Sequence, residues 1–319
     1  MSRPKQTLLK ALRSELPVGA SLLLAVSGGT DSMCLLHACC LLRKKLKIEI
    51  EVAHLDHRLR AVSHKDAAFV TEQVRNLGLV CHLQTAPVRP KRMNIEAWAR
   101  EQRYAFFKQV RSERKLDWIV TAHTADDAAE TLLMRLFSNK EPAGIEPADE
   151  QRRLLRPMLS VSRVQVLDFA RQHKVPHIED ESNSDLTFLR NRVRHLVLPL
   201  LRDKFDTRIE ETLAERASGL AQDIKFLYSL IDKDVDAASK HRFGSRAWLR
   251  TVKVSLAAMP VALQWRFAET LLKPVLGYNL GRSKSVALGA FLGGATEGIE
   301  LPGGIRLRAK AGGIVLDRG

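Results

Sequence analysis

One segment indicates the architecture of this chain most clearly: Leu22-Leu23-Leu24-Ala25-Val26-Ser27-Gly28-Gly29-Thr30-Asp31-Ser32. Five apolar residues, typical of a buried strand, run directly into a loop with two glycines and then into a segment with helical spacing. Glycine has no Cβ, so the backbone can turn sharply and present its N–H groups to an anion. The following helix adds the partial positive charge of its N-terminus. The stretch therefore predicts a strand, a phosphate-binding loop and a helix.

The side chains of this loop suit the same task. Hydroxyl donors come from Ser27, Thr30 and Ser32, and Asp31 can hold a metal ion such as Mg²⁺ against phosphates. We expect the nucleotide to be bound by Ser27, Gly28, Gly29, Thr30, Asp31 and Ser32. A plain strand-to-helix turn with Ser and Asp as caps is the alternative. The spacing matches neither the Walker loop, G-x-x-x-x-G-K-[ST], nor the dinucleotide motif, G-x-G-x-x-G.

On both sides of this loop, short apolar runs alternate with segments of helical spacing. The expected strands are residues 21–26, 48–55, 79–84 and 118–122, with a weaker one at 175–178. The expected helices are residues 31–44, 64–77, 95–110, 125–137 and 162–173. Alternation of this kind predicts an α/β fold, a mostly parallel sheet with helices on both faces, with ligands outside the carboxyl ends of the strands.

The chain of 319 residues exceeds the usual size of one hydrophobic core, so we expect more than one domain. Residues 1–202 form the predicted nucleotide-binding catalytic domain. Residues 203–240 are predicted to form a helical connector. Residues 241–319, in which Gly303-Gly304 and Gly312-Gly313 are flanked by short β-like runs, are predicted to form a small mixed domain. Proline, glycine and acidic residues between 142 and 147 indicate a loop.

Charge is the first indication of a partner. The 51 basic residues outnumber the 36 acidic ones, which gives a net charge of +15. Residues 241–319 hold 12 basic and 4 acidic residues, a net of +8 within the last quarter of the chain. Such a surface attracts phosphate backbones through its field and through counterion release. An anionic membrane or a merely soluble basic protein would give the same charge.

The overall composition, the cysteine spacing and the length of the apolar runs exclude several classes of protein. The hydrophobic fraction of 45% and the charged fraction of 27% are those of a globular protein. The four cysteines include no C-x-x-C pair, so neither a zinc ribbon nor an iron–sulfur cluster is supported. The longest clean apolar run is far shorter than the roughly 20 residues that cross a bilayer. We expect a cytoplasmic protein with reduced thiols.

The loop S-G-G-x-D-S after a first strand resembles the pyrophosphate loop of the ATP pyrophosphatases, and further segments narrow that resemblance. They are residues 54–60, 96–104, 121–131, 156–157, 180–183 and 190–194. Together these segments resemble the tRNA(Ile)-lysidine synthetase family, over roughly residues 21–200. The resemblance implies a ligase with two steps. The wobble cytidine of a tRNA(Ile) with a CAU anticodon is adenylated by ATP, and the side-chain amine of free L-lysine then displaces AMP.

Asp127 and Glu130 are three residues apart at an expected helix start, so their carboxylates share one face. A lysine ammonium needs an anionic pocket and its amine must lose a proton, so paired carboxylates suit both tasks. A capping box from Thr124 to Asp127 is the alternative. His123, at the end of the preceding strand, is a third catalytic candidate that could reach the reacting phosphate or base; a structural histidine is the alternative.

Two sets of arginines are also candidates. Arg103 can steady negative charge on the α-phosphate, whereas its neighbour Arg100 has a helix salt bridge with Glu96 as the alternative. The other set is the basic segment formed by Arg190, Arg192 and Arg194, predicted to bind tRNA phosphate unless it is a solvated face.

His54 and Asp56 share a strand face, with His57 following, which would suit zinc. A third well-spaced ligand is missing, so we expect His54 to line the nucleotide pocket instead. The sequence also departs from the family at Arg58, where a small residue is commonest, and at Glu181, where proline is usual. Residues 138–144 contain less glycine than the family usually has in this loop.

Two other functions remain open. A tRNA thiolase of the same superfamily would activate a base in the same way, although such enzymes generally need a cysteine pair or a cluster. A non-catalytic RNA-binding relative would keep the fold without turnover. Asp31, Asp127 and Glu130 favour an enzyme, and the sequence indicates no protein partner and no membrane association.

Overall fold

The computed structural model describes residues 7–58, 63–90, 95–138, 141–178, 185–310 and 312–318. Two compact units divide the chain. The first comprises the described residues up to Leu132 together with Gly144–Ala217, and the second comprises Leu133–Ala143 together with the described residues from Ser218 onward. The boundaries therefore fall within helix α5, Ala125–Leu136, and within helix α9, Ile209–Ser229. The expected connector, 203–240, is shared between the two units.

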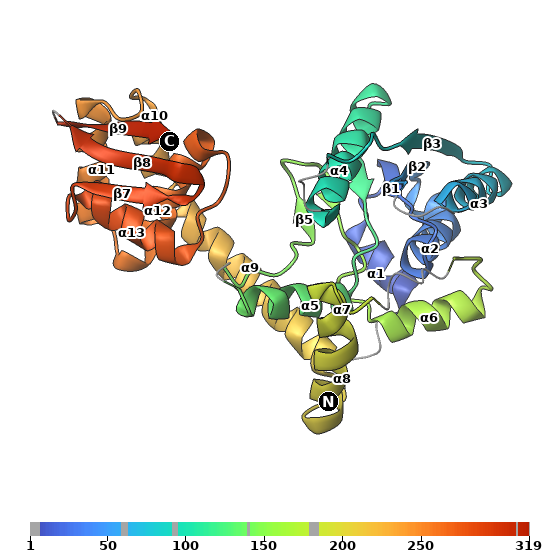
Figure 1. The fold of residues 1–319 in the computed structure, drawn as a ribbon. Helices are drawn as coiled ribbons and strands as arrows, with labels where there is room; N and C mark the ends of the chain where they lie inside the picture. The colour runs from blue at the N-terminus through green and yellow to red at the C-terminus, as the bar shows by residue number, and fades with distance from the viewer. Residues whose placement is uncertain are drawn as a thin grey trace. The chain divides into compact units, whose positions relative to one another are not determined.

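The first unit is built on a six-stranded sheet with the order β3-β2-β1-β4-β6-β5. Its strands are β1 Ser21–Ala25, β2 Glu49–Asp56, β3 Val80–Thr85, β4 Trp118–Val120, β5 Ala148–Asp149 and β6 Leu154–Leu155. All neighbouring pairs are parallel except β5 with β6. The predicted mostly parallel sheet is confirmed, with β1 at its centre (Figure 1).

Helices cover both faces because the strand side chains alternate. Leu22 and Leu24 of β1 point into one core, and Leu23 points into the other. The first core is closed by α1 Leu8–Glu15, α2 Thr30–Leu46, α3 Ser63–Asn76 and α6 Arg163–Gln172, and the second by α4 Ile95–Glu113. The five helices expected in this region are confirmed to within a few residues; α1 was not predicted.

The segment 175–178 is not a strand, contrary to the sequence prediction. It makes one isolated parallel bridge, Gly29 with Ile178, in which the Ile178 N–H donates to the Gly28 carbonyl at 3.0 Å. Pro176 has no N–H to offer a ladder. The chain after α6 therefore packs against the glycine loop instead of extending the sheet. The real additions to the sheet, β5 and β6, have only two residues each and were missed.

The described part of residues 185–217 is helical. It contains α7 Leu189–Arg192, a π-helical turn Val193–Val197, α8 Leu198–Lys204 and the first part of α9. The second unit continues with α10 Asp232–Ser239, α11 Arg246–Ala258, α12 Val261–Leu276 and α13 Arg282–Gly293, followed by the antiparallel strands β7 Gly298–Leu301, β8 Ile305–Lys310 and β9 Gly313–Arg318. The predicted small mixed domain is confirmed, with its own core around Phe267 and Leu272.

Within the ranges described, no helix combines the length and the apolarity that a bilayer crossing requires.

Candidate active site

The glycine loop leaves the carboxyl end of β1 and its second glycine caps α2. Gly28 has φ +95°, a conformation that side chains other than glycine rarely adopt, whereas Gly29 has an extended φ of −71° as the N-cap of α2. The first turn of α2 leaves backbone N–H groups without helical partners. The loop thus points free donors and the positive helix end toward the carboxyl edge of the sheet, as the sequence predicts.

Hydrogen bonds within the loop hold it in this shape. The Ser32 hydroxyl donates to the Gly29 carbonyl at 2.9 Å and accepts from the Ser27 N–H at 3.1 Å. Ser32 is buried, so its hydroxyl fastens the loop; Ser27, which is exposed, lies 3.2 Å from it, Oγ to Oγ. Of the residues expected to bind phosphate, Ser32 is therefore engaged within the loop, whereas Ser27 is exposed to solvent.

Replacing Gly28 with alanine tests the loop geometry. A Cβ there would lie 3.2 Å from both Ile178 Cδ1 and Val70 Cγ2, in addition to the positive φ. We expect a loss of roughly 1–2 kcal/mol in the free energy of unfolding from the left-handed backbone alone, together with weaker nucleotide binding. Gly29→Ala is the matched control, because its Cβ would meet nothing closer than Ser27 Oγ at 3.7 Å. Chemical denaturation of both variants gives the comparison, and equal stability of the two would contradict this account.

Asp31 lies in the first turn of α2 with one carboxylate oxygen unsatisfied. Among the described residues, its Oδ1 is buried without a hydrogen-bond partner, and its Oδ2 is 3.8 Å from Arg163 Nη1. Burial raises the pKa of Asp31 to about 6, against the opposing charge of Arg163. A buried, unsatisfied carboxylate oxygen at the mouth of a phosphate loop fits one ligand of Mg²⁺, which is usually held by one or two carboxylates and by phosphates.

Arg163 was not predicted as a site residue, although it contacts both the glycine loop and the start of α5. Its side chain approaches Asp31, and its backbone N–H donates to Asp126 Oδ2 at 2.7 Å at the start of α6. Asp126 precedes Asp127 at the start of α5. The sequence held one signal for a special role of Arg163: it is a basic residue in the first turn of a helix, where acidic residues are favoured.

The carboxylates of Asp127 and Glu130 lie on one face of α5, as predicted. The capping box is also present, because Asp127 Oδ2 accepts from the Thr124 N–H at 2.8 Å. The Glu130 side chain is 1% exposed and the Asp127 side chain 14% exposed. Burial raises the pKa of Asp127, but Arg190, His123, the Thr124 N–H and Arg194 outweigh it, and the pKa is lowered overall.

Arg190 and Arg194 share a helical face, as predicted, and that face turns toward these carboxylates. Arg190 donates from Nε to Glu130 Oε2 and from Nη2 to Asp127 Oδ1, both at 2.7 Å. Arg194 donates from Nε to Glu130 Oε1 at 2.6 Å. Arg192 is exposed and donates to the carbonyls of Leu186 and Thr187. The basic segment is therefore part of the site, and contact with RNA remains a prediction.

Burial favours the neutral form of three histidines near the site, His54, His57 and His123. His54 is buried, and its Nδ1 donates to the Val26 carbonyl at 2.8 Å, directly before the loop. Burial lowers its pKa, and burial with Arg103 lowers the pKa of His57 to about 4. His123 Nδ1 lies 2.8 Å from Thr121 Oγ1, and burial lowers its pKa as well. No group of three or more His, Cys, Asp or Glu side chains suited to a metal occurs in the described ranges.

Arg103 projects from α4 toward His57. Its Nε and Nη2 both lie 3.4 Å from His57 Nε2, and its side chain is exposed. Arg100 lies over the Tyr104 ring at 4.9 Å, while the side chain of Glu96, its alternative partner, lies outside the described residues. Arg60 and the motif residues 180–183 also lie outside them. Arg156, directly after β6, belongs to the motif segment 156–157 but was given no role; it is buried, and its Nη1 donates to the Glu146 carbonyl.

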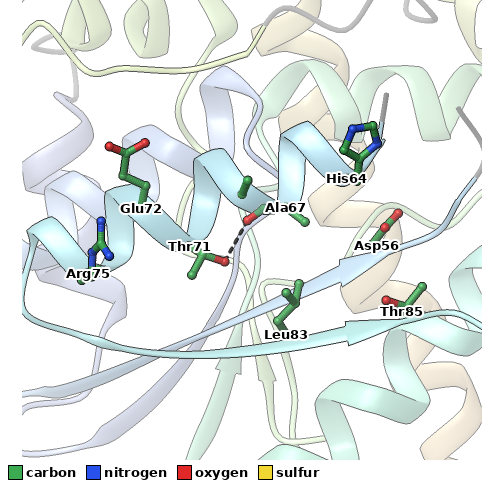
Figure 2. Close-up of a pocket in the computed structure, with 9 residues that line it drawn as sticks. Asp56, His64, Ala67, Thr71, Glu72, Arg75, Leu83 and Thr85 are labelled. Atoms are coloured by element: carbon green, nitrogen blue, oxygen red, sulfur yellow. Dashed lines mark hydrogen bonds between the residues drawn. The ribbon is translucent and has the colours of Figure 1, made fainter. Parts of the chain in front are cut away.

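A pocket of about 590 Å³ lies beside this site, between α3 and the ends of β2 and β3 (Figure 2). Asp56, from the second-strand motif, lines it together with Thr71, Leu83 and Thr85. None of the predicted catalytic residues lines this pocket, so it is separate from the carboxylate–arginine cluster.

Comparison with known proteins supports the family resemblance. The profile of a family described as a PP-loop domain matches residues 2–201. A tRNA(Ile)-lysidine synthase of Gloeobacter violaceus is 37% identical over 268 residues, 82% of this chain and 79% of that protein. One of Thermosynechococcus vestitus is 33% identical over 92% of this chain and 85% of its own length.

The fold also resembles that of a solved structure. The U34-tRNA thiolase NcsA from Methanococcus maripaludis, with its [4Fe-4S] cluster, superimposes with a TM-score of 0.55 over 65% of this chain and 76% of that chain, at 13% identity. At that identity the similarity concerns the fold alone.

Proposed function

The chain belongs to the tRNA(Ile)-lysidine synthase family of PP-loop proteins, and from this membership we propose that it is an ATP-dependent ligase acting on tRNA. It joins L-lysine to the wobble cytidine of a tRNA(Ile) with a CAU anticodon through a new carbon–nitrogen bond. The cytidine is adenylated at its 2-position with release of pyrophosphate, and the lysine amine then displaces AMP.

One observation carries this proposal: Arg163 contacts both the glycine loop and the start of α5, the helix that carries Asp127 and Glu130. The Asp31 side chain lies 3.8 Å from Arg163, whose N–H is bound to Asp126, next to Asp127. The loop proposed to bind phosphate and the carboxylates proposed to bind the ammonium are therefore neighbours in one unit. A reaction that joins an adenylate to an amine needs that arrangement.

Each residue has a distinct proposed role. The loop from Ser27 to Ser32 holds the pyrophosphate, with Asp31 as ligand of Mg²⁺, which when bound would neutralise phosphate charge. Arg103 steadies charge on the α-phosphate. Asp127 and Glu130 bind the lysine ammonium. The lowered pKa of Asp127 makes it a weak base, so its proposed part is to hold the ammonium. Burial lowers the pKa of His123 to about 4, so His123 is also a weak base and is proposed to contact the reacting phosphate or base as a neutral hydrogen-bonding group.

The decisive experiment incubates the full chain with ATP, labelled lysine and tRNA(Ile) with a CAU anticodon. Label should enter the RNA in an ATP-dependent manner, with one AMP and one pyrophosphate per lysine. A thiolase would leave lysine unincorporated, and a non-catalytic RNA-binding relative would show no ATP–pyrophosphate exchange.

The second unit contributes a basic strand that suits RNA. Along β8, Arg306, Arg308 and Lys310 are exposed, whereas Ile305, before them, and Leu307, between the two arginines, are buried. We expect replacement of the three basic residues by glutamine to weaken tRNA binding and to reduce the salt slope by about 2.7, because each neutralised phosphate contributes about 0.9 to that slope. Filter binding of tRNA at several salt concentrations measures both quantities.

A charge-matched control is available at the C-terminal end of α2. Arg43, Lys44 and Lys45 are exposed there, and their replacement by glutamine removes the same three charges. If both triple variants bound tRNA with equally weakened affinity, the effect of β8 would be that of net charge alone.

A further inference from the structure

In the pocket proposed for lysine, each carboxylate oxygen of Asp127 and Glu130 already accepts a hydrogen bond from a neighbouring group. Glu130 Oε1 accepts from Arg194, and Oε2 accepts from Arg190 at 2.7 Å and from Arg194 at 3.2 Å. Asp127 Oδ1 accepts from Arg190, and Oδ2 accepts from the Thr124 N–H. An ammonium must donate to such oxygens in order to be held. A carboxylate oxygen can accept more than one hydrogen bond, but both side chains already face guanidiniums, so a lysine ammonium has to compete with Arg190 and Arg194 for these oxygens.

The charges and the exposure of this cluster show which side can move. Two carboxylates and two guanidiniums sum to zero, so the closed cluster offers no net attraction to a cation. The exposed fraction of the side chain is 1% for Glu130 and 14% for Asp127, but 21% for Arg194 and 36% for Arg190. The arginines form the outer layer, and they are the members that a ligand from solvent reaches first.

The two arginines suit a second kind of anion. A guanidinium fork pairs with a phosphate as readily as with a carboxylate. Arg194 lies in the π-helical turn Val193–Val197, and such turns are rare and occur frequently at functional sites. A change of this turn from π-helix to α-helix would reorient Arg194. Such a change would move its guanidinium from a position on the carboxylates to one away from them.

We propose that Arg190 and Arg194 close the lysine pocket until tRNA arrives, and that phosphates of the tRNA then draw them away from Asp127 and Glu130. The ammonium of lysine takes the place that the guanidiniums leave. This inference rests on the proposed function and adds an order of binding to it: RNA first, lysine second. The device keeps the amine away from the loop while no RNA is present.

Equilibrium dialysis with labelled L-lysine tests the proposal on the full chain, without ATP, with and without tRNA(Ile). Coupling between two sites typically changes affinity about 5- to 150-fold, and we expect tRNA to lower the lysine Kd by about tenfold or more. By linkage, saturating lysine raises tRNA affinity by the same factor. A lysine Kd in the wild type that does not respond to tRNA would overturn the proposal.

Arg190→Gln opens the outer side of the pocket. We expect it to bind lysine without RNA more tightly than the wild type does, and to lose most of the response to tRNA. Arg114→Gln is the matched control, because Arg114 pairs with Glu51, a carboxylate that is 14% exposed, and within the described structure it pairs with neither Asp127 nor Glu130. Should Arg190→Gln be poorly folded, the wild-type measurement still decides.

The complete reaction with ATP separates this inference from the proposed function. If lysine enters tRNA but binds equally well with and without RNA, the arginine gate is wrong and the ligase function stands. If the wild type neither binds nor transfers lysine under any condition, the proposed function fails, and the gate fails with it.

Discussion

Replacement of Asp31 by alanine is expected to abolish AMP formation in the presence of tRNA while leaving the protein folded. Its Oδ1 is the buried carboxylate oxygen that lacks a partner at the mouth of the phosphate loop in the described structure. Removal of one such electrostatic interaction with a reacting group typically costs about 10²–10³-fold in rate. Single-turnover release of labelled AMP from ATP measures the effect, and thermal unfolding checks that the fold is retained.

Asp168→Ala is a suitable control for Asp31. Asp168 is an exposed acid on α6 that pairs, within the described structure, with Arg171, one turn away on the same helix. We expect this variant to release AMP at the wild-type rate. Near-normal AMP release by Asp31→Ala would mean that the glycine loop is a plain strand-to-helix turn and that ATP binds elsewhere.

Glu130→Gln is expected to impair the second chemical step far more than the first. Glutamine keeps the size and one carbonyl acceptor, so the change removes charge from a side chain that is 1% exposed. Hydrogen bonds to charged groups contribute about 1.5–3 kcal/mol, so we expect the lysine KM to rise by about 10- to 100-fold. Adenylated tRNA should accumulate, because ATP consumption does not depend on this carboxylate.

Glu51→Gln is the matched control for Glu130→Gln, and it serves better than Glu210→Gln, whose carboxylate interacts with Asp126. Glu51, on β2, is a 14% exposed glutamate that pairs with Arg114 and His82, so its replacement also removes a paired carboxylate but leaves the groups around Asp127 unchanged. Adenylate and lysidine are measured separately in a single turnover. If adenylation failed first, with lysine affinity untouched, Asp127 and Glu130 would be reassigned to metal or ATP binding.

The thiolase alternative rests on a similarity that extends only to the fold. The thiolase structure shares the arrangement of the sheet at 13% identity, whereas the lysidine synthases share 33–37% identity over most of this chain. The four cysteines do not form a C-x-x-C pair. Cys34 and Cys39 are buried in the first core, where burial raises the pKa of each thiol. These thiols are packing groups by their surroundings.

Local patterns determined most of the first unit. Leu22 to Asp31 encodes a buried strand, a positive-φ glycine and a helix start, each set by neighbours in sequence, and all three are present. The same reasoning failed for the segment 175–178, because an apolar run with β propensity pairs only where a strand edge is available. It also missed β6, whose two residues, Leu154 and Leu155, are too few for a period to be detected.

The amino-acid sequence alone was enough to name the candidate residues for the chemistry and to say which of them share a helical face. Asp127 and Glu130 are three apart and Arg190 and Arg194 are four apart, so helical periodicity alone aligns each pair. The meeting of the two faces is visible only in the folded chain, because the pairs are about sixty residues apart and no periodic pattern reaches that far. A charged residue in sequence has no assigned partner. The fold determines whether an arginine faces RNA or a buried carboxylate, and here it brings Arg190 and Arg194 onto the carboxylates proposed to bind lysine.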